Sequence, residues 1–221
     1  NDNVRMEVAA NPNISKDILV VLAEDEFSGV RVEVAANAKT PVGVLAVLAF
    51  DSDKHVLCRV AQNSNTSKDI LVLLASDLND TVRGYVAANP NTPVDVLTVL
   101  ASDLDEYVRW QVAGNMNTFE ATLAGLAEDD SSDVRAELAG NTSTPKGTLA
   151  ILSTSVDYKV RAAVAGNPNT PANALITLST DSSGDVHRDV AANPNTPAPA
   201  LTFLATNRDE CVRWRVAYNE N

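Results

Sequence analysis

The stretch that decides the fold is VRGYVAANPNTPVDVLTVLASD, residues 82–103. Its first part places apolar residues at Val82, Val86 and Ala87, which form one stripe of a short helix over residues 82–88. Its second part places Leu97 and Leu100 three residues apart on another apolar face. The stretch therefore predicts two short amphipathic helices joined by a turn.

The same pattern recurs along the whole chain every 26 residues, with no insertion or deletion. A fixed period of this size is the signature of stacked repeats. We therefore interpret residues 1–221 as a single repeat domain. A truncated ninth unit begins at Val212, and the eight complete units begin at Val4, Val30, Val56, Val82, Val108, Val134, Val160 and Val186.

The turns of the repeat carry residues that end and begin helices. Asn89 is a residue type that tolerates the left-handed conformation found just past a helix end, and a helix cannot continue through Pro90. Thr92 is expected to cap the second helix, with Pro93 at its first helical position. Asp105 is placed to cap the first helix of the next unit.

The core pattern is the same in every complete unit. Two leucines three residues apart occur in all eight, and alanine occupies the sixth position of all nine units, where a longer side chain would prevent close approach of neighbouring layers. Helices of about ten residues are marginal alone in water, so each unit must be stabilised by its neighbours. The sequence predicts an all-α solenoid of stacked two-helix repeats.

The pattern V-R-x-x-V-A-x-N-P-N-T-P-x-x-x-L-x-x-L-A-x-D over Val4–Asn219 resembles the bacterial leucine-rich repeat variant family, a helical relative of HEAT and armadillo solenoids. The resemblance implies a right-handed superhelix with two short helices per unit, one of which can be a 3₁₀-helix, and a binding or scaffolding role. A founding member carries an iron–sulfur cluster outside its repeats. The two cysteines of this chain cannot supply a four-thiolate site, so we expect no cofactor.

Charge and hydropathy exclude two classes of partner. The net charge of −12 opposes the counterion release that supplies most nucleic-acid affinity. The longest uncharged apolar run, Val42–Phe50, is far short of the roughly 18 residues that a membrane-spanning helix needs. With no charged-then-apolar leader and only two cysteines, the default expectation is a cytoplasmic protein.

Three recurring polar features have a structural and a functional interpretation. The arginine at the second position could form an anion-binding ladder, but a recurring aspartate at position 22 favours an internal charge ladder. The repeated asparagines favour hydrogen bonds to the backbone across stacked turns, because no base or nucleophile accompanies them. Acidic turns such as 51–53 and 103–106 lack the oxygen pattern of a calcium loop and favour helix capping. The arginines are Arg5, Arg31, Arg83, Arg109, Arg135, Arg161 and Arg213, with Leu57 and His187 in their place in two units.

No catalytic or metal-binding constellation is visible. His55 and His187 lie five units apart, and Cys58 and Cys211 are also in distant units, so neither pair can share a metal or a disulfide. The chain has no phosphate-binding loop and no H-E-x-x-H motif. We therefore predict that the protein is not an enzyme.

The third and fourth positions of the first helix vary most between units. Aromatic residues and arginine, which anchor many protein interfaces, occur among them. The candidate protein-binding residues are Arg59, Tyr85, Trp110 and Gln111, while the alternative is that large side chains only cover small neighbours. Trp214, at the same position of the last unit, could instead be a buried terminal residue. The net charge favours a basic or amphipathic protein or peptide as partner.

The leading hypothesis is a noncatalytic protein-binding scaffold that uses this variable ladder. The first alternative is a structural or self-associating module within a larger protein, because repeat ends are open to stacking. A weaker alternative is an enzyme accessory that presents a substrate or a cofactor.

Overall fold

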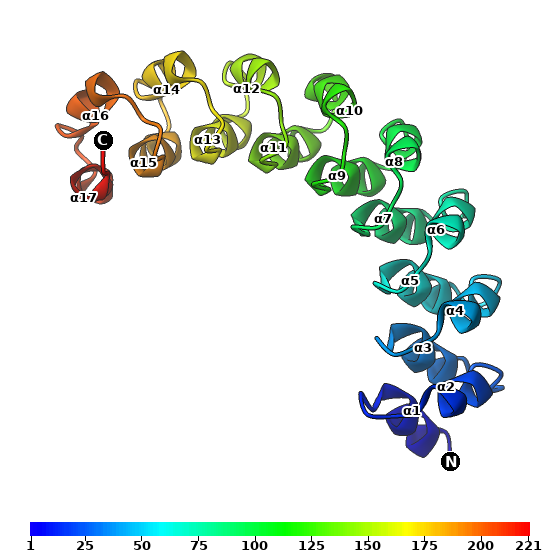
Figure 1. Cartoon of the computed structure of the whole chain (residues 1–221). Coiled ribbons are helices and arrows are strands. Elements are labelled where there is room, and N and C mark those ends of the chain that lie inside the picture. Colours follow the sequence, from blue (N-terminus) through cyan, green and yellow to red (C-terminus); the bar gives the residue numbers. More distant parts are fainter. The chain divides into compact units, whose positions relative to one another are not determined.

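The computed structural model describes residues 1–221 and is entirely helical, with seventeen α-helices, one 3₁₀ turn and no strand. The prediction of an all-α repeat fold is confirmed. The repeat unit contains two helices, of which the first carries an odd number and the second an even number (Figure 1). Packing divides the chain into two compact units, residues 1–117 and residues 118–221, which are described separately.

Unit 1 holds four complete repeats and the first helix of a fifth. Its even-numbered helices are α2 (Lys16–Leu22), α4 (Val42–Leu48), α6 (Lys68–Leu74) and α8 (Val94–Leu100). Its odd-numbered helices are α1 (Asp2–Ala10), α3 (Ser28–Ala36), α5 (Lys54–Gln62), α7 (Asp80–Ala88) and α9 (Glu106–Gly114).

Unit 2 has the same alternation. Its even-numbered helices are α10 (Glu120–Gly125), α12 (Lys146–Leu152), α14 (Ala172–Leu178) and α16 (Ala198–Leu204), and α10 is followed by the 3₁₀ turn η1 (Leu126–Glu128). Its odd-numbered helices are α11 (Ser132–Gly140), α13 (Tyr158–Gly166), α15 (Gly184–Ala192) and α17 (Glu210–Tyr218). The second helix is thus α-helical in every repeat, and 3₁₀ geometry is confined to η1.

Within each unit the odd-numbered helices form a closely packed layer. Each of them contacts the next odd-numbered helix, whereas the even-numbered helices contact mainly the odd-numbered helices before and after them. The sixth-position alanine explains this asymmetry, because Ala35, Ala61 and Ala87 are completely buried between adjacent helices. This confirms the close approach expected from the sequence.

The leucines and valines of the repeat form a continuous core within each unit. Leu45, Leu71 and Leu97 have no exposed surface, and the first-position valines Val30 and Val56 are equally buried. Full burial of one such side chain contributes about 1.5–3 kcal/mol. Because each layer covers the apolar face of the next, helices of seven to nine residues become stable.

The turn between the two helices differs from the expectation in two respects. Asn89 has φ −71° and ψ 128°, an extended conformation, and no residue of the chain has positive φ. Thr92 does not cap α8, which begins at Val94 after Pro93 without a side-chain cap. Its buried hydroxyl instead donates to the Val86 carbonyl at 2.5 Å, which ties the turn to the end of α7.

The expected cap of the other helix is confirmed. The Asp105 carboxylate accepts the backbone N–H of Tyr107 at 2.9 Å, and Asp53 caps α5 in the same way through the His55 N–H. Each carboxylate lies at a helix N-terminus, where it satisfies an unpaired amide and interacts favourably with the helix dipole. The acidic turns therefore serve the start of the following helix.

Candidate functional site

The four candidate residues all lie on odd-numbered helices of unit 1. Arg59 is on α5, Tyr85 on α7, and Trp110 and Gln111 are on α9. Arg59 is exposed, and the other three are half-buried. The third-position residues differ in their exposure to solvent, because Cys58 and Gly84 are buried. Trp214 is 60% exposed, so the buried alternative for that residue is wrong.

Two of the candidates belong to an aromatic cluster that includes a residue not identified from the sequence. The ring of Tyr107 stacks on Trp110 with centroids 6.3 Å apart and meets Tyr85 edge-on at 6.5 Å. The Gln111 side-chain amide donates to the Tyr107 hydroxyl at 2.8 Å. Tyr107 precedes Trp110 by three residues, so helical spacing could have placed both rings on one face.

Gly84 makes room for this cluster. A Cβ atom at this position would lie 2.3 Å from Cε1 and 2.6 Å from Cδ1 of Tyr107, closer than any normal contact. The missing side chain on α7 therefore allows the ring of Tyr107 from α9 to pack against the neighbouring helix. The space at Gly84 thus allows one continuous aromatic surface, which consists of Tyr85, Tyr107 and Trp110.

A groove of about 610 Å³ runs across unit 1 next to the aromatic cluster. We call it the α5 groove, because α5 supplies more of its lining than any other helix. Its less exposed residues include the apolar Met6, Val32 and Cys58 together with polar side chains, and its exposed residues are mainly polar. The complete lining is Met6, Phe27, Ser28, Gly29, Val32, Glu33, Asp53, Lys54, His55, Cys58, Arg59, Gln62, Thr81 and Tyr85.

The charged groups of the α5 groove differ in their hydrogen bonds and ion pairs. The Asp53 carboxylate is held by the Ser28 hydroxyl and by the His55 backbone N–H, which keep its pKa below the usual range. The Arg59 guanidinium donates to the neutral Gln62 side chain at 2.9 Å and has no carboxylate partner. Glu33 has no ion pair. Charges of both signs, Glu33 on one side and Arg59 with the exposed Lys54 on the other, are therefore available to a ligand.

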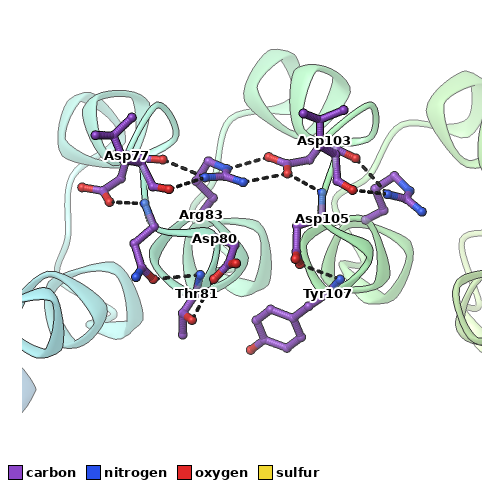
Figure 2. A network of polar contacts seen from close by, with 11 residues as sticks. Asp77, Asp80, Thr81, Arg83, Asp103, Asp105 and Tyr107 are labelled. Atoms are coloured by element: carbon purple, nitrogen blue, oxygen red, sulfur yellow. Dashed lines mark hydrogen bonds and ion pairs between the residues drawn. The ribbon is translucent and has the colours of Figure 1, made fainter.

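Several second-position arginines, in contrast, are bound to aspartates within the fold. Arg83 binds both carboxylate oxygens of Asp103, at 2.6 Å and 2.8 Å, and its remaining Nη1 donates to the Asp77 carbonyl at 2.8 Å (Figure 2). Arg5, Arg31 and Arg161 bind the aspartate twenty residues later in the same way. The ladder joins successive turns, which confirms its structural interpretation.

Three repeats depart from this pairing. Leu57 replaces the arginine, so the Asp77 carboxylate has no arginine twenty residues before it. Ser155 replaces the aspartate twenty residues after Arg135. In the third case His187 replaces the arginine and Asn207 replaces the aspartate, with the Asn207 amide nitrogen 3.0 Å from His187 Nδ1. The ladder therefore keeps a hydrogen bond there without an ion pair.

The arginine–aspartate pairs make the free energy of unfolding depend on pH. The hydrogen bond from Arg83 is the largest effect that lowers the pKa of Asp103. A carboxylate whose pKa is lower in the folded chain stabilises it above the unfolded pKa of about 4, and this contribution is lost as pH falls through the folded pKa. We expect acidification from pH 5 to pH 3 to reduce the free energy of unfolding more in the wild type than in Asp103→Asn, measured by urea melts.

The matched control for this comparison is Asp95→Asn, an exposed aspartate of α8 that has no arginine partner. This variant should show the same pH dependence as the wild type. If Asp103→Asn also retains the full acid sensitivity, the ladder does not contribute it.

The asparagines form a second ladder inside the fold. Asn89 Nδ2 donates to the carbonyl groups of Ala61 and Asn63 in the preceding repeat, at 2.6 Å and 3.2 Å, and its Oδ1 accepts the Asn91 N–H at 2.8 Å. The equivalent residues Asn37, Asn63, Asn115, Asn167, Asn193 and Asn219 make the same bonds. The expected role of these residues in the turns is confirmed.

Other reactive groups are not assembled into a site. No group of three or more His, Cys, Asp or Glu residues is placed to hold a metal ion, and Cys58 and Cys211 are both free thiols. Burial raises the pKa of Cys58, which disfavours its reactive thiolate. None of the helices combines the length and the apolar character needed to cross a bilayer.

The repeat matches a known protein family. The model of that family, described as "Leucine rich repeat variant", matches residues 80–105, one full period that spans α7 and α8. Residues 80–105 are therefore similar to a leucine-rich repeat variant repeat. The other complete units share the pattern of the matched one at the same spacing. The match thus falls on the pattern that carries the resemblance.

Solved structures show the same fold. A leucine-rich repeat variant described as having a novel repetitive structural motif superposes with a TM-score of 0.66 and 25% identity, covering 91% of this chain and 80% of that one. The YibA protein of E. coli has a TM-score of 0.55 and 15% identity over 100% of this chain and 96% of that one, a likeness of fold alone. No curated protein sequence matches the chain. The chain is thus a helical repeat scaffold, and none of these matches indicates a catalytic family.

Proposed function

We propose that this chain is a noncatalytic scaffold that binds a protein or peptide on the odd-numbered helices of unit 1. One observation carries the proposal. The polar groups of the core, turns and arginine ladder bind one another, whereas the α5 groove offers Glu33 and Arg59 without ion-pair partners beside an apolar lining. Unpaired charges around an apolar depression are the features of a recognition surface.

The aromatic cluster supplies the anchors of this surface. Tyr85 lines the α5 groove and also contacts the ring of Tyr107. The ring of Tyr107 in turn stacks on Trp110. Large aromatic side chains bury much apolar area at little conformational cost and dominate the binding energy of many interfaces. The proposed binding surface therefore comprises Arg59, Tyr85, Trp110 and Gln111 together with Tyr107.

The proposed partner is an amphipathic polypeptide with a net positive charge. Its apolar side chains would occupy the α5 groove, and the net charge of −12 would attract it at low salt. Raising the ionic strength shortens the range of this attraction, from about 30 Å at 0.01 M salt to about 8 Å at 0.15 M. Association should therefore slow with added salt.

The proposal is tested with peptides selected from a random-sequence phage library on the intact chain. We expect Tyr85→Ala and Trp110→Ala each to weaken the selected peptides at least tenfold, because anchors of this kind typically contribute about 2 kcal/mol or more. Affinities are measured by isothermal titration, and melting curves verify the fold.

Unit 2 offers matched controls for these substitutions. Tyr158 and Trp214 are exposed aromatic residues on its odd-numbered helices, and Tyr158→Ala and Trp214→Ala should leave the affinities unchanged. If the unit 2 substitutions weaken binding and those of unit 1 do not, the proposed surface is wrong.

A further inference from the structure

The fourth positions of three successive repeats line up along the α5 groove. Glu33 on α3, Arg59 on α5 and Tyr85 on α7 all contribute to its lining, and their helices pack side by side in that order. Packed helices lie about 8–10 Å apart. A ligand that crosses the groove therefore meets an acidic, a basic and an aromatic side chain at intervals of about 8–10 Å.

Only some polypeptide conformations present side chains at this interval on one face. A polyproline II helix has three residues per turn and a rise of about 3.1 Å, so every third side chain faces the same way at about 9 Å. A β-strand repeats at about 6.6 Å or 13 Å on one face and does not match. An α-helix comes close with every seventh residue, at about 10.5 Å.

The spacing separates the two conformations that come closest. The α5 groove extends over the helices from α1, which carries Met6, to α7, which carries Tyr85. The repeat of about 9 Å of a polyproline II helix lies within the roughly 8–10 Å between packed helices, whereas the repeat of about 10.5 Å of every seventh α-helical residue exceeds it. The groove therefore favours an extended chain over a helix.

The charges along the groove define the side chains that such a chain needs. Glu33 has no ion pair, and the Arg59 guanidinium bonds only the neutral Gln62. The nearby Arg31 and Arg83 are instead bound to aspartates. A basic ligand residue opposite Glu33 and an acidic one opposite Arg59 would each gain a charge-assisted hydrogen bond.

We infer that the α5 groove recognises an extended, polyproline-type peptide with a basic, an acidic and an aromatic or large apolar residue at every third position. The acidic residue lies in the middle opposite Arg59, the basic residue faces Glu33, and the apolar residue packs on Tyr85. This inference rests on the proposed function and specifies the segment of the partner that enters the groove. It also fits Phe27 and Met6 at the acidic end of the groove, where the flanking residues of the peptide find an apolar lining.

The experiment uses fluorescent peptides and the intact chain. Lysine, glutamate and phenylalanine stand at every third position with proline between them, in both chain directions. Matched peptides exchange the lysine and the glutamate, and a third set spaces the same residues seven apart in a helical background. Affinities are measured by fluorescence anisotropy at low and at moderate salt.

We expect a peptide with glutamate in the middle to bind at least tenfold more tightly than its charge-exchanged counterpart, with a smaller ratio at higher salt. The double variant Glu33→Lys/Arg59→Glu should reverse this preference, which a merely structural role of these residues would not do. Melting curves of the double variant verify its fold. Lys54 is left unchanged in every variant, so that the other charges of the groove remain constant.

Two outcomes overturn the inference. Equal affinities, within threefold, for the two charge orders exclude the charge pattern, and tighter binding of the seven-residue spacing excludes the extended conformation. Library-selected peptides that still depend on Tyr85 in either case would leave the proposed function intact. Loss of that dependence would instead remove the proposed function itself.

Discussion

Substitution of Asn89 by aspartate will lower the free energy of unfolding by about 3–5 kcal/mol, the loss expected when a buried polar network retains an unpaired charge. The buried amide of Asn89 donates to the carbonyl oxygens of Ala61 and Asn63. A carboxylate there would place negative charge against both oxygens. Since protonation of the aspartate removes the charge, the loss should shrink as pH falls. Urea melts at pH 7 and pH 4.5 measure both effects.

The matched control is Asn91→Asp in the same turn. Asn91 also donates across the repeat interface, to the Ser64 carbonyl at 2.8 Å, but it is exposed to solvent. Water can hydrate the new carboxylate, so the loss should stay below about 1.5 kcal/mol. Equal losses at the two positions would mean that burial of the asparagine ladder is not what makes it essential.

Truncation of Leu97 to alanine is expected to cost about 2–5 kcal/mol. Leu97 has no exposed surface and lies between α8 and the odd-numbered helices that flank it. Its loss removes buried area and leaves a cavity that the short, stacked helices can close only in part. Val99→Ala is the control on the same helix, because Val99 is 73% exposed and its loss should cost well under 1 kcal/mol. A cost at Leu97 as small as that at Val99 would show that the assigned core face is wrong.

The repeat and its core were predictable because they depend on local periodicity. The spacing of Val82, Val86, Leu97 and Leu100 defines both helices and the faces that they bury. The recurrence of this pattern every 26 residues then requires stacking, since no single unit can bury its own apolar faces. Burial of the sixth-position alanines follows from the same argument.

The errors in the turn have one physical cause. Asn89 and Thr92 were assigned by their local preferences for helix ends and caps, but both side chains form non-local or buried hydrogen bonds instead. An unsatisfied buried carbonyl group costs about 1–3 kcal/mol, which outweighs the roughly 1 kcal/mol of a typical helix cap. Such partners belong to another helix or another repeat, so spacing within one unit does not reveal them.

The candidate site was predictable in its location but not in its form. The variability of the third and fourth positions pointed to Arg59, Tyr85, Trp110 and Gln111. The role of Tyr107 depends on the space left by Gly84 in the preceding repeat, a contact between helices 23 residues apart in sequence. The α5 groove likewise depends on how side chains from four helices pack, which periodicity alone cannot specify.

The most direct test of the proposed binding surface is a map of backbone amide NMR shifts on addition of a library-selected peptide. We expect the perturbed amides to lie on α3, α5, α7 and α9, with the largest changes around Arg59 and Tyr85 in the α5 groove. The even-numbered helices of unit 1 and the whole of unit 2 should remain unperturbed. Shifts confined to the even-numbered helices or to unit 2 would contradict the assignment of binding to this surface.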